Sequence, residues 1–182
     1  MREFDLNGLR LAEYQAKLFE QSAKKLECST AIFLRRFMYS ELLVSLDVNE
    51  SSLISLNIDD GLKSIEDEFG KTSYGKEKYS SESLFWIGYL YRYISYTRNV
   101  GTPFLMKLFN HKQLNELYYV YHTQDLEWCI QNLLELNNLS ESVFDRNCRL
   151  REVIKSDYII NNKKWYTTCL SNLNIQVVSG TK

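Results

Sequence analysis

Apolar residues recur at helical spacing along most of this chain. Positions three and four apart form one stripe over residues 6–26, which predicts an amphipathic helix. A second stripe predicts a helix over residues 31–46, with Ser29 or Thr30 as its N-terminal cap. The polar, serine-rich residues 47–57 predict a loop between this helix and the next one.

The stretch after residue 57 predicts a short helix and a long connection. Asp59 or Asp60 provides the helix start, and Gly70 suits its end because glycine readily closes a helix. Residues 71–79 contain three lysines and two tyrosines and predict an ordered loop packed by its own tyrosines. This loop lacks the Gly-Lys-Ser/Thr pattern and the preceding strand of a phosphate-binding loop, which argues against nucleotide binding there.

The most distinctive element is a predicted helix over residues 81–98, capped by Ser80 or Ser81. It is apolar or aromatic on almost every side, so other helices or a partner must surround it. Further helices are predicted over residues 103–109, 112–119, 123–136 and 140–155. One proline and seven glycines are too few for the turns of a sheet-rich chain.

These elements predict an all-α fold. We expect one compact domain over residues 1–156, with six to eight helices packed around the helix at 81–98. Residues 157–182 have a different pattern and predict a basic tail that is irregular or contains short strands. The 182 residues are enough to bury a sizeable core in one domain.

Charge and cysteine usage narrow the possible functions. The net charge of −1 predicts no general attraction to nucleic acid, although residues from Arg146 onward contain seven Lys or Arg against two Asp or Glu. That basic tail either contacts an acidic partner or is simply solvated. The four cysteines form no metal-ligand pattern, and no apolar leader or membrane span is evident. We therefore expect a cytoplasmic protein with no metal, no cofactor and no membrane contact.

Arg92 is the first candidate functional residue. It shares a helix face with Phe85, Tyr89 and Tyr96. A buried arginine must be paired, because an uncompensated charge in a low-dielectric interior costs several kcal/mol. Arg92 therefore forms either an internal ion pair that fixes helix packing or a contact to a partner or ligand, and the sequence leaves both open.

The segment from Tyr118 to Asp125 is the second candidate. His122 directly precedes a predicted helix start, where the helix dipole disfavours a protonated imidazole. General-base chemistry would need a nucleophile beside it, and neither Asp125 nor Cys129 completes a recognisable triad. A capping or interface role is favoured, and no catalytic residue is assigned. His111 is expected in a surface turn.

Tyrosine and arginine are common anchors of protein–protein interfaces. Aromatic and basic residues together can also bind single-stranded nucleic acid by stacking, but the tyrosines here are spread round a helix as core residues are. Protein binding is therefore favoured over nucleic-acid binding. The predicted partner-binding residues are Arg35, Arg36, Tyr91, Arg92, Tyr121 and His122.

Four segments resemble a family of small bacterial proteins, mostly from Firmicutes, that are uncharacterised or regarded as antitoxins encoded beside ADP-ribosyltransferase-like toxins. The resemblance covers about residues 10–145, and residues from Arg146 onward depart from it. The segments that carry it are Ala31-Ile32-Phe33-Leu34-Arg35-Arg36-Phe37-Met38, Tyr74-Gly75-Lys76-Glu77-Lys78-Tyr79-Ser80, Trp86-Ile87-Gly88-Tyr89-Leu90-Tyr91-Arg92-Tyr93 and Tyr121-His122-Thr123-Gln124-Asp125.

The resemblance implies a non-enzymatic protein that neutralises or regulates a neighbouring toxin, and it brings no catalytic residues. The alternative is a regulator that binds DNA or RNA through Arg35 and Arg36 or through the basic tail. A third hypothesis is an enzyme of unknown type centred on His122.

Overall fold

A computed structural model describes residues 2–48 and 57–148, and these residues form an all-α fold without β-strands. Residues 141–148 are also helical. The expected tail at 157–182, the end of the last helix and the domain boundary near residue 156 lie outside the described residues. The named helices are α1 (Leu6–Lys25), α2 (Thr30–Tyr39), α3 (Glu41–Asp47), α4 (Ile58–Phe69), α5 (Ser81–Thr97), α6 (Thr102–Leu108), α7 (His111–Tyr121) and α8 (Leu126–Leu136).

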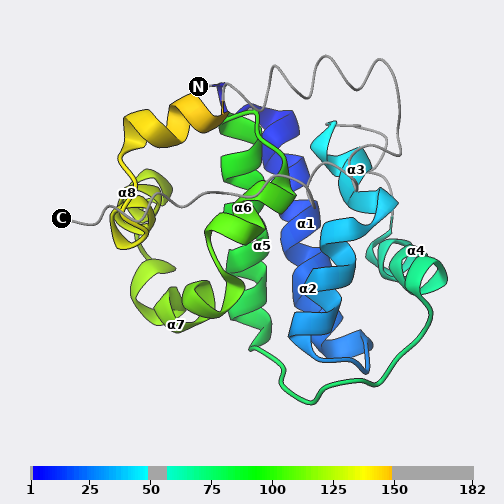
Figure 1. Ribbon diagram of the computed structural model, residues 1–182. Helices are drawn as coiled ribbons and strands as arrows, with labels where there is room; N and C mark the ends of the chain where they lie inside the picture. The colour runs from blue at the N-terminus through cyan, green and yellow to red at the C-terminus, as the bar shows by residue number, and fades with distance from the viewer. Residues whose placement is uncertain (1, 49–56, 149–182) are drawn as a thin grey trace.

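The antiparallel pair of α1 and α5 forms the centre of the molecule, as the sequence predicted for the aromatic-rich helix. Figure 1 shows α2, α3 and α4 on one side of this pair and α7 and α8 on the other. Gly88 lies at the closest approach of the two helices: a Cβ atom there would lie 3.0 Å from the Cα of Ala16. The Gln15 amide also donates a hydrogen bond of 3.0 Å to the Gly88 carbonyl.

The buried side chains explain why these helices pack together. Phe19 of α1 makes edge-to-face contacts with Phe33 and Phe37 of α2, with ring centroids 5.4 and 4.9 Å away. Such pairs add about 0.5–1.5 kcal/mol each beyond the burial of their apolar area. The apolar stripe seen in the first 26 residues therefore forms one wall of the core.

The predicted helix over residues 31–46 is wrong in one respect, because Ser40 divides it into α2 and α3. Ser40 has an extended backbone, with φ −77° and ψ 151°. Its hydroxyl accepts a hydrogen bond of 3.2 Å from the Leu43 amide, so Ser40 caps α3. Serine side chains compete with helical backbone bonding in this way, and Glu41 follows in the favoured first turn.

The connection at residues 70–80 is ordered by backbone hydrogen bonds and by one of its two tyrosines, Tyr79, which packs against the core. The Tyr74 ring is 74% exposed, contrary to the prediction. Its carbonyl instead accepts a hydrogen bond of 3.0 Å from the Ser29 amide, and the Glu77 carbonyl accepts one of 3.0 Å from the Thr30 amide. Lys78 donates to the carbonyls of Ala23, in the last turn of α1, and Leu26, just after α1. Together with the backbone hydrogen bonds to Ser29 and Thr30, these contacts hold the loop against both α1 and α2.

Gly75 allows this loop to approach α2, and we expect Gly75→Ala to destabilise the fold. Gly75 has φ +80°, and a Cβ atom there would lie 2.4 Å from the Ser29 hydroxyl oxygen. Left-handed backbone costs a non-glycine residue about 1–2 kcal/mol, before any clash is counted. Urea denaturation of the purified variant measures this loss.

Gly70→Ala is the matched control for that experiment. Gly70 has nearly the same φ, +78°, but a Cβ atom at Gly70 would meet no neighbouring group within 4 Å. The clash therefore predicts a larger loss of unfolding free energy for Gly75→Ala than for Gly70→Ala. Equal losses would show that contact with Ser29 does not matter.

Candidate interaction surface at the turn between α7 and α8

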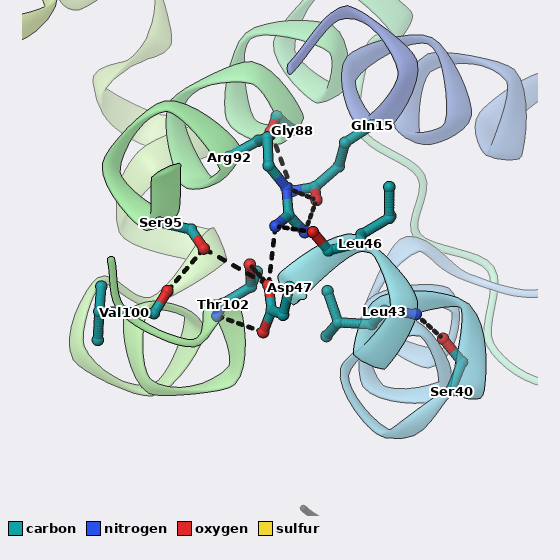
Figure 2. Close-up of polar contacts among 10 residues, drawn as sticks. All are labelled: Gln15, Ser40, Leu43, Leu46, Asp47, Gly88, Arg92, Ser95, Val100 and Thr102. Carbon is teal, nitrogen blue, oxygen red and sulfur yellow. Dashed lines mark hydrogen bonds and ion pairs between the residues drawn. The ribbon is translucent and has the colours of Figure 1, made fainter. Parts of the chain in front are cut away.

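Arg92 lies at the centre of a buried polar network between α1, α3 and α5 (Figure 2). Its Nε and Nη2 donate to the Gln15 Oε1 atom at 2.9 and 2.7 Å. Its Nη1 donates to Asp47 Oδ1 at 2.8 Å and to the Leu46 carbonyl at 3.1 Å. Both side chains of the Arg92–Asp47 ion pair are fully buried. The planar guanidinium thus joins α1 and α3 to the central helix.

Asp47 extends the same network to α6. The Thr102 amide donates to Asp47 Oδ2 at 2.9 Å, and the Thr102 hydroxyl donates to Asp47 Oδ1 at 2.7 Å. The Ser95 hydroxyl lies 3.4 Å from Asp47 Oδ1 but only 2.6 Å from the Val100 carbonyl. A hydroxyl has one proton, so Ser95 donates to Val100, the nearer acceptor.

This geometry corrects two predicted partner-binding residues. Arg92 and Tyr91 each have an exposed fraction of 0%, and the Tyr91 hydroxyl donates to the Phe109 carbonyl inside the core. Neither side chain has surface to offer a partner in this fold. Arg92 forms an internal ion pair with Asp47, which was one of the two alternatives predicted for it.

Arg35 and Arg36 differ in what they contact. Arg36 donates to the carbonyls of Gly70 at 2.6 Å and Phe69 at 3.3 Å, where α4 ends. Arginine is favoured there because it satisfies the last carbonyls of a helix and interacts well with its dipole. Arg35 is exposed. Of this predicted pair, Arg35 is thus the side chain better placed to meet a partner.

The other two predicted residues, Tyr121 and His122, lie at the turn that joins α7 to α8. Tyr121 is 7% exposed and contacts Trp128 edge-to-face, with ring centroids 5.2 Å apart. His122 is exposed and stacks on Tyr118, with centroids 4.5 Å apart. We call the accessible residues around this turn the α7–α8 surface. They are Tyr118, Tyr119, Val120, His122 and Trp128.

Large apolar side chains on the α7–α8 surface are unusually exposed. Tyr119 is 80% exposed, Val120 is 61% exposed and Trp128 is 41% exposed. The sequence analysis singled out neither Tyr119 nor Trp128 as a candidate for partner binding. The run Tyr118-Tyr119-Val120-Tyr121 could have predicted an exposed ring such as Tyr119, because four consecutive helical positions cannot all face one core.

The base of this surface is held firmly. Trp86 of α5 packs edge-on against Tyr118, with ring centroids 6.1 Å apart. The Asp125 carboxylate caps α8 by accepting from the amides of Glu127 at 2.9 Å and Trp128 at 3.2 Å. The exposed rings therefore project from a preorganised turn, which lowers the entropy cost of binding.

A second cluster of charged groups lies beside the start of α8. Arg98 forms ion pairs with Glu127 at 3.1 Å, Asp145 at 3.1 Å and Glu141 at 3.4 Å. The Arg98 side chain is only 7% exposed, whereas the three carboxylate side chains are 31–52% exposed. Tyr93 also donates to Glu127 at 2.9 Å. One arginine cannot neutralise three carboxylates, so the accessible rim of this cluster is acidic.

The arrangement gives no support to general-base chemistry at His122. Its Nδ1 donates to the Tyr118 carbonyl at 2.8 Å. The Cys129 thiol donates instead to the Tyr121 carbonyl at 3.4 Å, and burial raises the pKa of Cys129 to about 11. A protonated, buried thiol is a poor nucleophile. Cys28, Cys129 and Cys148 are buried and form no disulfide, and Cys169 lies outside the described residues.

His111 is not the surface turn residue that was predicted. It begins α7, is partly buried, and its Nδ1 lies 2.8 Å from the Tyr79 hydroxyl. Burial raises the pKa of Tyr79 to about 12, so the hydroxyl keeps its proton and can donate it to the neutral imidazole. Burial also lowers the pKa of His111, and the neighbouring Lys112 lowers it further.

We therefore expect the free energy of unfolding to fall between pH 8 and pH 5.5. Burial favours the neutral form of His111 in the folded state. The unfolded chain therefore binds more protons than the folded chain once the pH falls toward about 6.5, the ordinary pKa of histidine. Carboxylates titrate mostly below this window. Urea denaturation at the two pH values should show a smaller change for His111→Gln than for the unaltered protein, and an equal change would contradict the role of His111.

Across residues 2–48 and 57–148, no group of three or more His, Cys, Asp or Glu side chains is placed to hold a metal ion. Among the same residues, no helix has both the length and the apolar character needed to cross a membrane.

Comparison of the chain with protein-family models, curated proteins and solved structures finds no match.

Proposed function

We propose that this chain is a non-enzymatic, cytoplasmic protein-binding module that acts as an antitoxin-like partner of a toxin. The observation that carries the proposal is the exposed α7–α8 surface, with Tyr119 and Trp128 as its largest anchors. Tyrosine and tryptophan are enriched among the residues that dominate protein–protein affinity. The resemblance of the segment from Tyr121 to Asp125 to antitoxin-like proteins supports the same function.

In the proposed mechanism the helices at the centre serve as a scaffold. The buried Arg92 network fixes α1, α3, α5 and α6 relative to one another, and Trp86 supports Tyr118 from below. The α7–α8 surface then covers a functional cleft of the toxin. Because Tyr118 is packed against α5 and Asp125 caps α8, little backbone freedom of this turn is lost on binding.

Affinity capture of the tagged full-length protein from its native host, followed by mass spectrometry, tests this function. The expected result is one stoichiometric protein partner whose toxicity in a growth assay is suppressed by co-expression. Tyr119→Ala should weaken capture and suppression, whereas Tyr74→Ala, which alters an exposed tyrosine in the loop between α4 and α5, should not. Recovery of no protein partner would contradict the proposal.

A regulator that binds DNA or RNA is the alternative proposal. Residues 149–182 contain six Lys or Arg against two Asp or Glu, which favours it. The acidic rim around Arg98 disfavours contact with phosphates through the α7–α8 side of the molecule. Co-purification of nucleic acid, with binding that weakens steeply as salt is raised, would replace the protein-binding proposal with this one.

A further inference from the structure

The charge of the described residues is unevenly distributed. Residues 111–148 contain two Lys or Arg against six Asp or Glu, a net charge of −4. The remaining described residues contain 14 of each sign and cancel. The whole negative excess of the described chain therefore lies in the segment that carries the α7–α8 surface.

The acidic cluster and the exposed rings each include a residue at the start of α8. Glu127, which pairs with Arg98, directly precedes Trp128, which contacts Tyr121. The Glu141 side chain is 52% exposed and forms an ion pair with the same residue, Arg98. A peptide segment that covers Trp128 and continues along the start of α8 therefore also reaches carboxylates whose charge Arg98 only partly offsets.

The negative charge and the exposed aromatic rings together favour a ligand group that is both cationic and planar. A guanidinium pairs with carboxylates through directed hydrogen bonds and stacks on the faces of tyrosine and tryptophan. The protein already uses this contact internally, since the Arg2 guanidinium lies 3.9 Å from the centroid of the Tyr96 ring. A lysine ammonium supplies the charge but not the stacking plane, and a phosphate is repelled by the acidic rim.

We propose that the α7–α8 surface binds an arginine-bearing, basic segment of the partner protein, with arginine seated between the exposed rings and the carboxylates around Arg98. This inference rests on the proposed function and specifies the chemistry of the partner. The ligand class is a basic peptide segment in another protein.

The direct test titrates the full-length protein with synthetic peptides of alternating arginine and glycine. Matched peptides with lysine or glutamate in place of arginine serve as probes of charge and shape. We expect the arginine peptide to bind at least several-fold more tightly than the lysine peptide, and the glutamate peptide not to bind. Binding should weaken as the ionic strength increases.

Three variants locate the contact. Tyr119→Ala and Trp128→Ala should each reduce affinity for the arginine peptide about tenfold, equivalent to about 1.4 kcal/mol. Glu141→Gln should reduce it by a smaller factor, because Glu141 is one of three carboxylates on Arg98. Tyr74→Ala and Glu66→Gln alter exposed or partly exposed residues elsewhere and should leave affinity unchanged. Thermal unfolding of each variant checks that it is folded.

Three results would overturn the proposal. Equal binding of the arginine and lysine peptides would remove the stacking argument. Arginine-peptide binding that appears only when Arg149→Gln and Arg151→Gln are combined would show that this chain's own arginines are the occupant. Nucleic-acid binding that is lost in Tyr119→Ala would assign the surface to a different ligand.

The inference and the proposed function can fail separately. A captured protein partner that still binds to Tyr119→Ala and Trp128→Ala would leave the protein-binding function standing and remove this surface from it. Selective arginine-peptide binding without any captured partner would retain the chemistry of the surface and remove the antitoxin-like function.

Discussion

Replacement of Arg92 by methionine should lower the free energy of unfolding by about 3–5 kcal/mol, the cost of breaking a buried ion pair by removing one partner. The Asp47 carboxylate is fully buried and would lose its buried counter-charge. Gln15 would also lose both hydrogen bonds from the guanidinium. Urea denaturation followed by circular dichroism measures the loss.

Two further variants separate charge from shape at this site. Arg92→Lys retains a positive charge, but one ammonium cannot reproduce the fork that reaches Gln15 and Asp47 together, so an intermediate loss is expected. Arg35→Met makes the same chemical change as Arg92→Met on the exposed face of α2 and should change stability by no more than about 0.5 kcal/mol.

A double-mutant cycle gives the sharpest check of the pair. Arg92→Met combined with Asp47→Asn removes both charges, so the combined loss should be smaller than the sum of the two single losses. Additive losses, or a loss below about 1 kcal/mol for Arg92→Met alone, would contradict the buried network.

Replacement of Gly88 by valine should be the second most damaging change, with an expected loss of about 3 kcal/mol from overpacking. A Cβ atom at Gly88 would lie 3.0 Å from both the Ala16 Cα atom and the Gln15 carbonyl oxygen. These are backbone atoms of α1, so relief requires the two central helices to move apart. Thermal and urea denaturation both report the effect.

Gly61→Ala provides the matched control for Gly88→Ala. Both glycines are helical, but the nearest atom to a Cβ at Gly61 is the Tyr14 hydroxyl, the far end of a flexible side chain. Tyr14 can move, whereas the backbone of α1 cannot move without disturbing the core. Stability should therefore decrease in the order Gly61→Ala, Gly88→Ala, Gly88→Val, and unchanged stability of Gly88→Val would disprove the close approach.

The sequence predicted the helical architecture well because apolar periodicity is a local signal. The pattern of residues 81–98 indicated a surrounded helix, and α5 is that helix. The break at Ser40 was missed because the apolar stripe continues through it. The pair Ser40-Glu41 is the same kind of start signal as Ser81-Glu82 at the predicted helix over residues 81–98.

The site was less predictable because its contacts are long-range. The requirement that Arg92 be paired follows from physical chemistry, but its partners Asp47 and Gln15 lie 45 and 77 residues away in the sequence. Nothing local identifies them. Exposure is equally non-local: Tyr118 and Tyr119 are adjacent tyrosines, yet only Tyr118 has Trp86 against it.

The pairing of α1 with α5 also bears on how the chain is synthesised. Gln15 and its acceptor Gly88 are 73 residues apart. At about 5–20 residues per second, the ribosome needs roughly 4–15 s to deliver the second helix after the first. During that interval the apolar stripe of α1 has no central partner. Until α5 is synthesised, α2 and α4 are the earlier helices that can cover part of this stripe.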